Sequence, residues 1–222
     1  MRIILFGATG MVGQGVLREC LRDPQVTEVL AVGRRASGVS HSKLTDLIRR
    51  DLLDWSDAGE VLAGYDACFF CLGVSAAGMS EADYTRTTYD LTMAAATALA
   101  AANPQMTFIY VSGMGTDSSE AGRAMWARVK GRTENALLKL PFRAAHMFRP
   151  GFIQPVDGVR SGTTLYRLFY TVMAPLMPLL RRAFPSQIVT TAELGRAMLR
   201  VASKGHSQPL LESRDIAARA RE

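Results

Sequence analysis

Cysteine is scarce in this chain of 222 residues, and its few cysteines do not form the pattern of a disulfide-stabilised protein. There are three, Cys20, Cys68 and Cys71, which is too few for a disulfide framework. Cys68 and Cys71 form a C-x-x-C pair in the stretch DACFFCLG, a spacing that elsewhere binds zinc or carries redox chemistry. Here the stretch is typical of a buried strand, in which residues three apart point to opposite faces. We therefore expect two apolar thiols in the core, and the widely separated histidines suggest neither a metal site nor a catalytic triad.

Long hydrophobic runs are absent as well. The longest uncharged apolar run covers residues 168–180 and contains two prolines, whereas a membrane-spanning helix needs about 20 apolar residues. No secretory signal precedes the first strand, so the sequence predicts a cytoplasmic protein without a transmembrane segment. The apolar stretch 165–180 suits a substrate pocket or the subunit interface of a homodimer, and the two arginines after it leave a peripheral membrane role open.

Acidic residues are outnumbered, which gives the chain a net charge of +6. Such a charge favours anionic ligands in general. The arginines are scattered, and no basic helix with interleaved aromatic residues is present, so we expect no nucleic-acid partner. A nucleotide cofactor, bound together with a small-molecule substrate, accounts for the charge equally well.

What the sequence does contain is an alternation of strand and helix patterns over most of its length. Apolar runs at 2–6, 27–32, 66–72, 106–112 and 143–151, with a weaker one at 44–52, predict six strands. Helical patterns lie between them at 11–21, 56–63, 80–102 and 119–140. This alternation predicts an α/β fold with a doubly wound parallel sheet, the Rossmann fold, in strand order 3-2-1-4-5-6.

The length suits a single domain over residues 1–222, of which 1–153 would form the Rossmann core. The pattern loosens in 154–222, where we expect helices at 164–183 and 191–202 and a short strand at 209–211. We interpret this segment as a small helical elaboration on the substrate side. In open α/β sheets such segments close over the carboxyl ends of the strands, where ligands bind.

The stretch FGATGMVGQG gives three glycines at the spacing G-x-x-G-x-x-G, directly after a strand and at the start of a helix. Three glycines alone are weak evidence, but this context is the one that a dinucleotide-binding loop requires. Gly7 permits a tight turn, Gly10 lets the backbone approach a pyrophosphate, and Gly13 lets the helix pack closely on the sheet. The amides predicted to contact the pyrophosphate are those of Thr9, Gly10, Met11 and Val12.

The second strand ends in AVGRR, which bears on the choice of cofactor. A free ribose 2′-hydroxyl prefers an acidic residue at this place, whereas a 2′-phosphate prefers arginine. Arg34 and Arg35 offer two guanidinium groups that can hold a phosphate. The sequence therefore favours NADP(H) over NAD(H), unless both arginines simply face water.

With these features the chain resembles the short-chain dehydrogenase/reductase superfamily. It is most similar to the atypical small NAD(P)-binding members, such as the Tat-interactive oxidoreductase-like and sugar-nucleotide-epimerase-like proteins. The resemblance covers residues 2–153 and, more loosely, the stretch TTAELGRAML at 190–199. It implies an oxidoreductase or an epimerase-like enzyme.

The resemblance also implies a set of site residues. Ser112, in YVSGMG, matches the catalytic serine that polarises the substrate oxygen, and Lys130 matches the lysine that holds the nicotinamide ribose and lowers the pKa of a catalytic tyrosine. Asp51 and Leu52 match a pair that lies against the adenine. The remaining cofactor contacts that the resemblance implies are Cys71, Leu72 and Gly73 along the ribose and nicotinamide, and Pro150, Gly151 and Ile153 near the carboxamide.

One residue departs from the family pattern. The tyrosine of the family's Tyr-x-x-x-Lys pair is replaced by Trp126, four residues before Lys130, and an indole N–H donates a hydrogen bond but does not ionise usefully. A reductase would then need another proton source, such as Tyr84, Tyr89, Tyr110 or a relayed water. The alternatives are a non-catalytic NADP(H)-dependent sensor or scaffold, an acid that lies elsewhere, and a Trp126 that is simply packed in the core.

Overall fold

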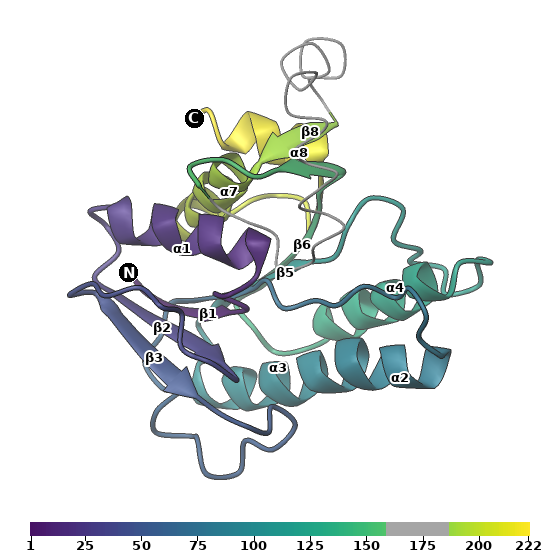
Figure 1. Cartoon of the computed structure of the whole chain (residues 1–222), viewed down its shortest axis with the longest axis horizontal. Coiled ribbons are helices and arrows are strands. Elements are labelled where there is room, and N and C mark those ends of the chain that lie inside the picture. The colour runs from purple at the N-terminus through teal and green to yellow at the C-terminus, as the bar shows by residue number, and fades with distance from the viewer. Residues whose placement is uncertain (159–186) are drawn as a thin grey trace.

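Seven parallel strands form the central sheet of the computed structural model, which describes residues 1–158 and 187–222 (Figure 1). Along the sheet the order is β3-β2-β1-β4-β5-β6-β9, which confirms the doubly wound Rossmann fold and the order of its first six strands. The seventh strand comes from the C-terminal segment and pairs with β6. The strands are β1 (Arg2–Phe6), β2 (Glu28–Gly33), β3 (Leu44–Ile48), β4 (Ala67–Phe70), β5 (Thr107–Val111), β6 (Ala144–Arg149) and β9 (Leu210–Glu212).

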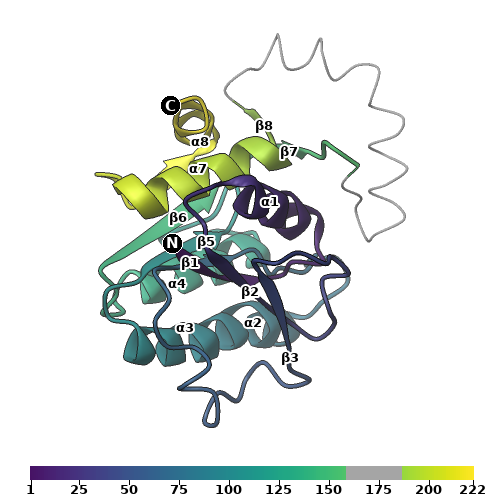
Figure 2. The ribbon, with the colours of Figure 1, turned by 90° about the vertical axis from the view of Figure 1, so that its left-hand side faces the viewer.

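Helices cover both faces of this sheet, and Figures 1 and 2 show α1, α7 and α8 on one side and α2, α3 and α4 on the other. Alternate residues of the strands divide the core in the same way. In β1, for example, Ile3 and Leu5 belong to the cluster under α1 and α7, whereas Ile4 and Phe6 belong to the cluster under α3. The helices are α1 (Met11–Arg22), α2 (Glu81–Thr85), the π-helical turn η1 (Arg86–Asp90), α3 (Leu91–Ala102), α4 (Met125–Leu137), α7 (Thr191–Lys204) and α8 (Ser213–Arg219).

The C-terminal segment is built into the core more deeply than the sequence suggests. Helix α7 packs directly against α1, and the contact depends on glycine: a Cβ on Gly15 would lie 2.4 Å from the Cβ of Thr191, and one on Gly195 would lie 2.9 Å from the Cβ of Glu19. A small parallel pair of strands, β7 (Phe152–Gln154) and β8 (Ile188–Thr190), joins the core to α7. The described part of this segment therefore completes the sheet and one helical layer.

One predicted helix is wrong, and another begins later than predicted. Residues 56–63 form a series of turns. Asp54, just before them, caps the first turn by accepting hydrogen bonds from both the amide and the hydroxyl of Ser56. The helix predicted at 119–140 begins only at Met125, because Asp117 binds the amides of Ser119 and Gly122 and holds the preceding residues in a loop. The predicted helix 164–183 lies outside the described residues.

Candidate nucleotide-binding site

The glycine loop after β1 has the geometry that the sequence predicts. Gly7 has φ +82°, a conformation that favours glycine, and its own Cβ would lie 2.8 Å from the backbone of Cys71. A Cβ on Gly13 would lie 2.0 Å from the carbonyl oxygen of Gly7. Both positions therefore require glycine so that α1 can start close against β1 and β4.

The first turn of α1 is open to an anionic ligand. The N-cap is Gly10, which has no side chain to satisfy the amides of the first turn. The amides of Met11, Val12 and Gly13 have no partner four residues earlier within the helix, and the helix dipole adds positive potential at the same place. Thr9 and Gly10 are exposed beside them, so the residues present fit a pyrophosphate.

A pocket for the rest of the nucleotide continues from this loop. Its wall consists of the ends of β2 and β4 and the turn after β3, and Leu52 forms part of it together with Cys71, Leu72 and Gly73. Asp51 is not part of the wall. It is exposed and caps a turn by accepting the amide of Leu53 at 2.8 Å, and its contact with adenine stays a prediction.

Arg34 and Arg35 lie at the mouth of this pocket. Both are exposed, and neither forms an ion pair with any residue in the described ranges 1–158 and 187–222. Their guanidinium groups are therefore available to a phosphate on the ribose. An acidic residue that the sequence interpretation missed lines the same pocket: Asp46, in β3.

The C-x-x-C pair has the arrangement expected of a core strand. Cys68 packs in the cluster under α3, whereas Cys71 packs toward α1 on the other side of the sheet. Burial raises the pKa of both thiols. Cys71 therefore borders the nucleotide pocket as a neutral, apolar group.

The carbonyl and amide groups after β6 are used inside the protein. The carbonyl of Pro150 accepts the amide of Met114 at 2.9 Å, and the amide of Gly151 donates to the hydroxyl of Ser213 at 2.6 Å. Ile153 lies in β7 beside Val189. The structure thus places Pro150, Gly151 and Ile153 at the junction with the C-terminal segment, and their contact with a carboxamide stays a prediction.

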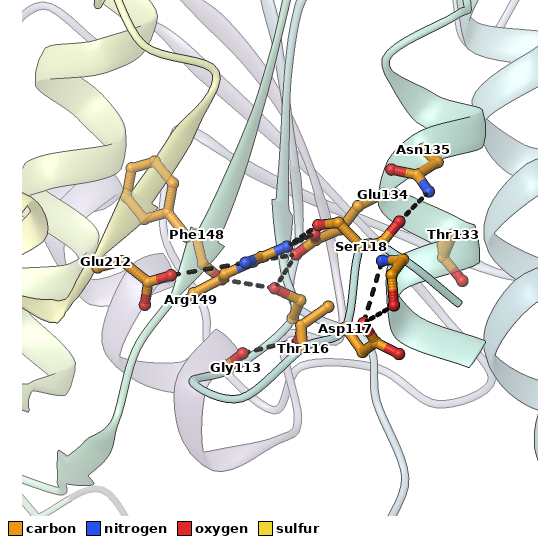
Figure 3. A network of polar contacts seen from close by, with 12 residues as sticks. Gly113, Thr116, Asp117, Ser118, Thr133, Glu134, Asn135, Phe148, Arg149 and Glu212 are labelled. Atoms are coloured by element: carbon orange, nitrogen blue, oxygen red, sulfur yellow. Dashed lines mark hydrogen bonds and ion pairs between the residues drawn. The ribbon is translucent and has the colours of Figure 1, made fainter. Parts of the chain in front are cut away.

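Ser112 follows β5 but takes part in a buried ionic network, whose members Glu134 and Arg149 are labelled in Figure 3. Its side chain donates to Oε1 of Glu134 at 2.5 Å and to the carbonyl of Phe148 at 3.2 Å. Glu134 is fully buried, and both of its oxygens accept from Arg149, with the shortest distance, 2.5 Å, from Nη2. Because this hydroxyl is held inside the protein, the catalytic role predicted for Ser112 requires it to exchange Glu134 for a substrate.

Arg149 extends the network in two further directions. Its Nη2 donates to the hydroxyl of Ser118 at 2.5 Å, and its Nη1 lies 3.6 Å from Oε1 of Glu212. The hydrogen bonds to Glu134 raise the pKa of Arg149, while partial burial raises the pKa of Glu212. The network therefore ties α4, β6 and β9 together directly beside the carboxyl end of β5.

Lys130 lies on α4, one helical turn before Glu134, and it also faces the residue that follows β5. Its ammonium group donates to the backbone carbonyl of Ser112. Burial lowers the pKa of Lys130 to about 8, and the nearby charge of Glu134 opposes this shift. The structure thus brings Lys130 and Ser112 together, as predicted, and the pKa of the lysine lies close to neutral pH.

Trp126 is half-buried, and its ring edge lies against Gly115, where a Cβ would be 3.4 Å from the indole. A proton-transfer role for the tyrosines named as other proton sources stays a prediction. Tyr84 and Tyr110 are 2% and 1% exposed, and burial raises the pKa of both. Tyr89 packs its ring under the guanidinium of Arg132 at 4.2 Å.

Residues 7–144 match the protein family described as NAD(P)H-binding, which is more than half of the chain and includes the glycine loop and the pocket. The chain belongs to the NAD(P)H-binding family. This match and the Rossmann architecture support the resemblance to atypical short-chain dehydrogenases/reductases that the sequence indicates.

Two relatives and one solved structure illustrate this membership. The protein fmp52, mitochondrial, of Emericella nidulans is 30% identical over 158 residues, which is 68% of this chain and 66% of the relative. The chain thus spans just under two thirds of that relative. The protein HTATIP2 of Rattus norvegicus is 27% identical over 76% of this chain and 69% of its own. A short-chain dehydrogenase family protein from Francisella tularensis shares the fold, with TM-score 0.66 and 15% identity over 98% of both chains.

Family membership gives the described residues their context. In this NAD(P)H-binding protein, Glu134, Arg149 and Asp46 are the polar residues that sequence reasoning missed. Asp46 carried a signal, because an acid inside an otherwise apolar strand needs a partner. The signal for Glu134 was weaker: it lies four residues after Lys130.

A bilayer-spanning helix is not found in the part of the chain that the structure describes, where every helix is too short or too polar for that role.

Proposed function

We propose that the protein is an NADP(H)-dependent oxidoreductase or epimerase-like enzyme that acts on a small, mostly apolar substrate. One observation carries the choice of cofactor: Arg34 and Arg35 line the nucleotide pocket and have no ionic partner among the described residues. A 2′-phosphate supplies the missing negative charge, and arginine binds phosphate with two parallel hydrogen bonds. The phosphate loop at Gly10 would hold the pyrophosphate of the same molecule.

The chemistry would take place at the carboxyl ends of β4 and β5. When bound, the nicotinamide supplies or accepts a hydride. Lys130 is the described ionisable side chain at this place with a pKa near neutrality, so we assign to it the proton that a tyrosine would otherwise handle. Trp126 would shield this place from water and orient the substrate.

A second candidate function is a sensor or scaffold that binds NADP(H) and performs no chemistry. Two observations favour it: an indole stands where the family has its acid, and the hydroxyl of Ser112 is held by Glu134. In this alternative, cofactor binding would be read out through the network that joins α4 to β9.

Binding measurements and turnover measurements separate these proposals. We expect NADPH to bind more tightly than NADH in the wild type, and Arg34→Ala to weaken NADPH binding about tenfold while leaving NADH binding nearly unchanged, as for one lost charge-assisted contact. Equal affinities for both nucleotides would contradict the choice of NADP(H). Failure of both to bind would contradict the whole proposal.

The enzyme is tested with NADPH and a panel of aldehydes and ketones. Steady NADPH consumption by the wild type, absent in Lys130→Met, supports the enzyme. Lys130→Arg should also be inactive, because arginine stays protonated at all accessible pH values and cannot transfer the proton. Tight binding with no turnover, unchanged in Trp126→Tyr, supports the sensor. New reductase activity in Trp126→Tyr would instead show a disabled enzyme whose remaining machinery is intact. Cytoplasmic location and a homodimer are predictions of the sequence, and the name of the fungal relative gives mitochondria as the other compartment to test.

A further inference from the structure

Asp46 places a carboxylate in the nucleotide pocket from β3, whereas in the sequence an acidic residue was looked for only at the end of β2. It lines the pocket together with Arg34 and Arg35, although it belongs to β3 and the arginines follow β2. In the sheet it is paired in register with Ala31, whose side chain packs in the cluster beneath α1. Asp46 therefore points to the side of the sheet on which the phosphate loop and α1 lie.

The carboxylate of Asp46 is held in place by the loop that follows the two arginines. The amide of Ser37 donates to Oδ1 at 3.0 Å, and the hydroxyl of Ser37 donates to Oδ2 at 3.0 Å. The Ser37 oxygen in turn accepts the amide of Val39 at 3.3 Å. Each carboxylate oxygen keeps at least one further acceptor site, so a fixed carboxylate with spare acceptor capacity lines the same pocket as two exposed arginines.

We infer that Asp46 is the residue that limits discrimination between the two cofactors. It would accept a hydrogen bond from a free ribose hydroxyl and repel a 2′-phosphate, while Arg34 and Arg35 attract that phosphate. This inference rests on the proposed function and sharpens it. With two positive charges and one negative charge at the pocket mouth, the protein would prefer NADP(H) but still bind NAD(H).

The test uses the adenosine half of each cofactor, so that no substrate and no turnover are needed. The probes are adenosine 5′-monophosphate and adenosine 2′,5′-bisphosphate, with dissociation constants measured by calorimetry for the wild type and for Asp46→Asn. Asparagine keeps the shape and can still accept the amide of Ser37, but it removes the charge. We expect the bisphosphate to bind about tenfold more tightly and the monophosphate about threefold more weakly, a change of the affinity ratio well above tenfold.

Asp54→Asn is the matched control, because Asp54 also holds the amide and hydroxyl of a serine but lies outside the pocket. It should leave the ratio unchanged. Ser37→Ala removes one hydrogen bond without a change of charge, and it should shift the ratio less than about threefold. A ratio that Asp46→Asn leaves within twofold of the wild type overturns the inference, as does an equal shift in Ser37→Ala, which would assign the effect to loop order.

The proposed function fails separately and visibly. If neither probe nor either whole cofactor binds the wild type, nucleotide binding itself is contradicted and the inference falls with it. If the probes bind and Asp46→Asn leaves the ratio of their affinities unchanged, the proposal of a nucleotide site stands and Asp46 is a structural residue of β3.

Discussion

Replacing the buried carboxylate of Glu134 should destabilise the protein more than any exposed charge change. In Glu134→Gln the side chain keeps its size, but Arg149 loses the negative charge and one of the two oxygens that accept from its Nε and Nη2. The side chain of Arg149 is only 11% exposed, so water solvates its charge poorly. Removing one member of a buried pair typically costs 3–5 kcal/mol.

Glu212 reduces this cost because it lies 3.6 Å from the same guanidinium group and is half exposed. We therefore expect a loss of about 3 kcal/mol in the free energy of unfolding. For a chain of this length that corresponds to a decrease in Tm of about 6–12 °C. The measurement is urea-induced unfolding followed by circular dichroism, with a thermal scan of the same samples.

Glu81→Gln is the matched control, since Glu81 forms an equally short ion pair with Arg128 at 2.6 Å but is 52% exposed. Exposed pairs contribute about 0–1 kcal/mol, so its unfolding free energy should be nearly that of the wild type. If Glu134→Gln costs no more than Glu81→Gln, then burial does not set the strength of this network and the reasoning is refuted. The double variant Glu134→Gln with Arg149→Met should recover part of the loss, because it removes the orphaned charge.

Three further predictions concern the loop, the lysine and the helix contact. Gly13→Ala should lower affinity for both nucleotides at least about tenfold and destabilise the protein by about 1–3 kcal/mol, because its Cβ would lie 2.0 Å from a carbonyl oxygen; calorimetry checks this, with Gly59→Ala, which meets nothing within 4 Å, as the control. Burial holds the pKa of Lys130 near 8 in the folded protein against 10.5 unfolded, so the folded state binds fewer protons between these values, and the wild type should gain up to about 3 kcal/mol from pH 8 to 10.5. Lys130→Met should lack this gain in urea unfolding across that range, and an identical pH profile would contradict the shift. Gly15→Ala should cost about 1–3 kcal/mol in thermal unfolding, because a Cβ would lie 2.4 Å from that of Thr191; a loss no greater than that of Gly59→Ala would show that the helices can move apart.

The phosphate loop illustrates what can be predicted from sequence. Gly7, Gly10 and Gly13 are recognisable because their chemistry is local: a positive φ, a helix start and two close backbone approaches all fall within a few residues of chain. The same holds for Leu52 and Gly73, which follow strands and therefore reach the ligand edge of the sheet. Where the predicted helix 56–63 fails, the reason is also local, since Asp54 binds the backbone of the turn that starts at Ser56.

The ionic network lies outside the reach of such patterns. Ser112, Glu134 and Arg149 come from three elements separated by up to 37 residues, and nothing in the chain near Ser112 shows that its hydroxyl will be taken by Glu134. A buried carboxylate is tolerated only where its partners are already in place, so its existence depends on the packing of α4 against β5 and β6.

The sequence by itself determined the sheet, its strand order and the place of the phosphate loop, because apolar periodicity and glycine spacing act over short stretches of chain. Only the tertiary structure decided that Asp46 shares a pocket with Arg34 and Arg35, that the C-terminal strand completes the sheet, and that Lys130 and Glu134 are shielded from water beside Ser112. These depend on which strands become neighbours and on how much water is excluded between them. Charge–charge energies inside a protein are set by that exclusion and by distance through space, and the order of residues along the chain contains neither.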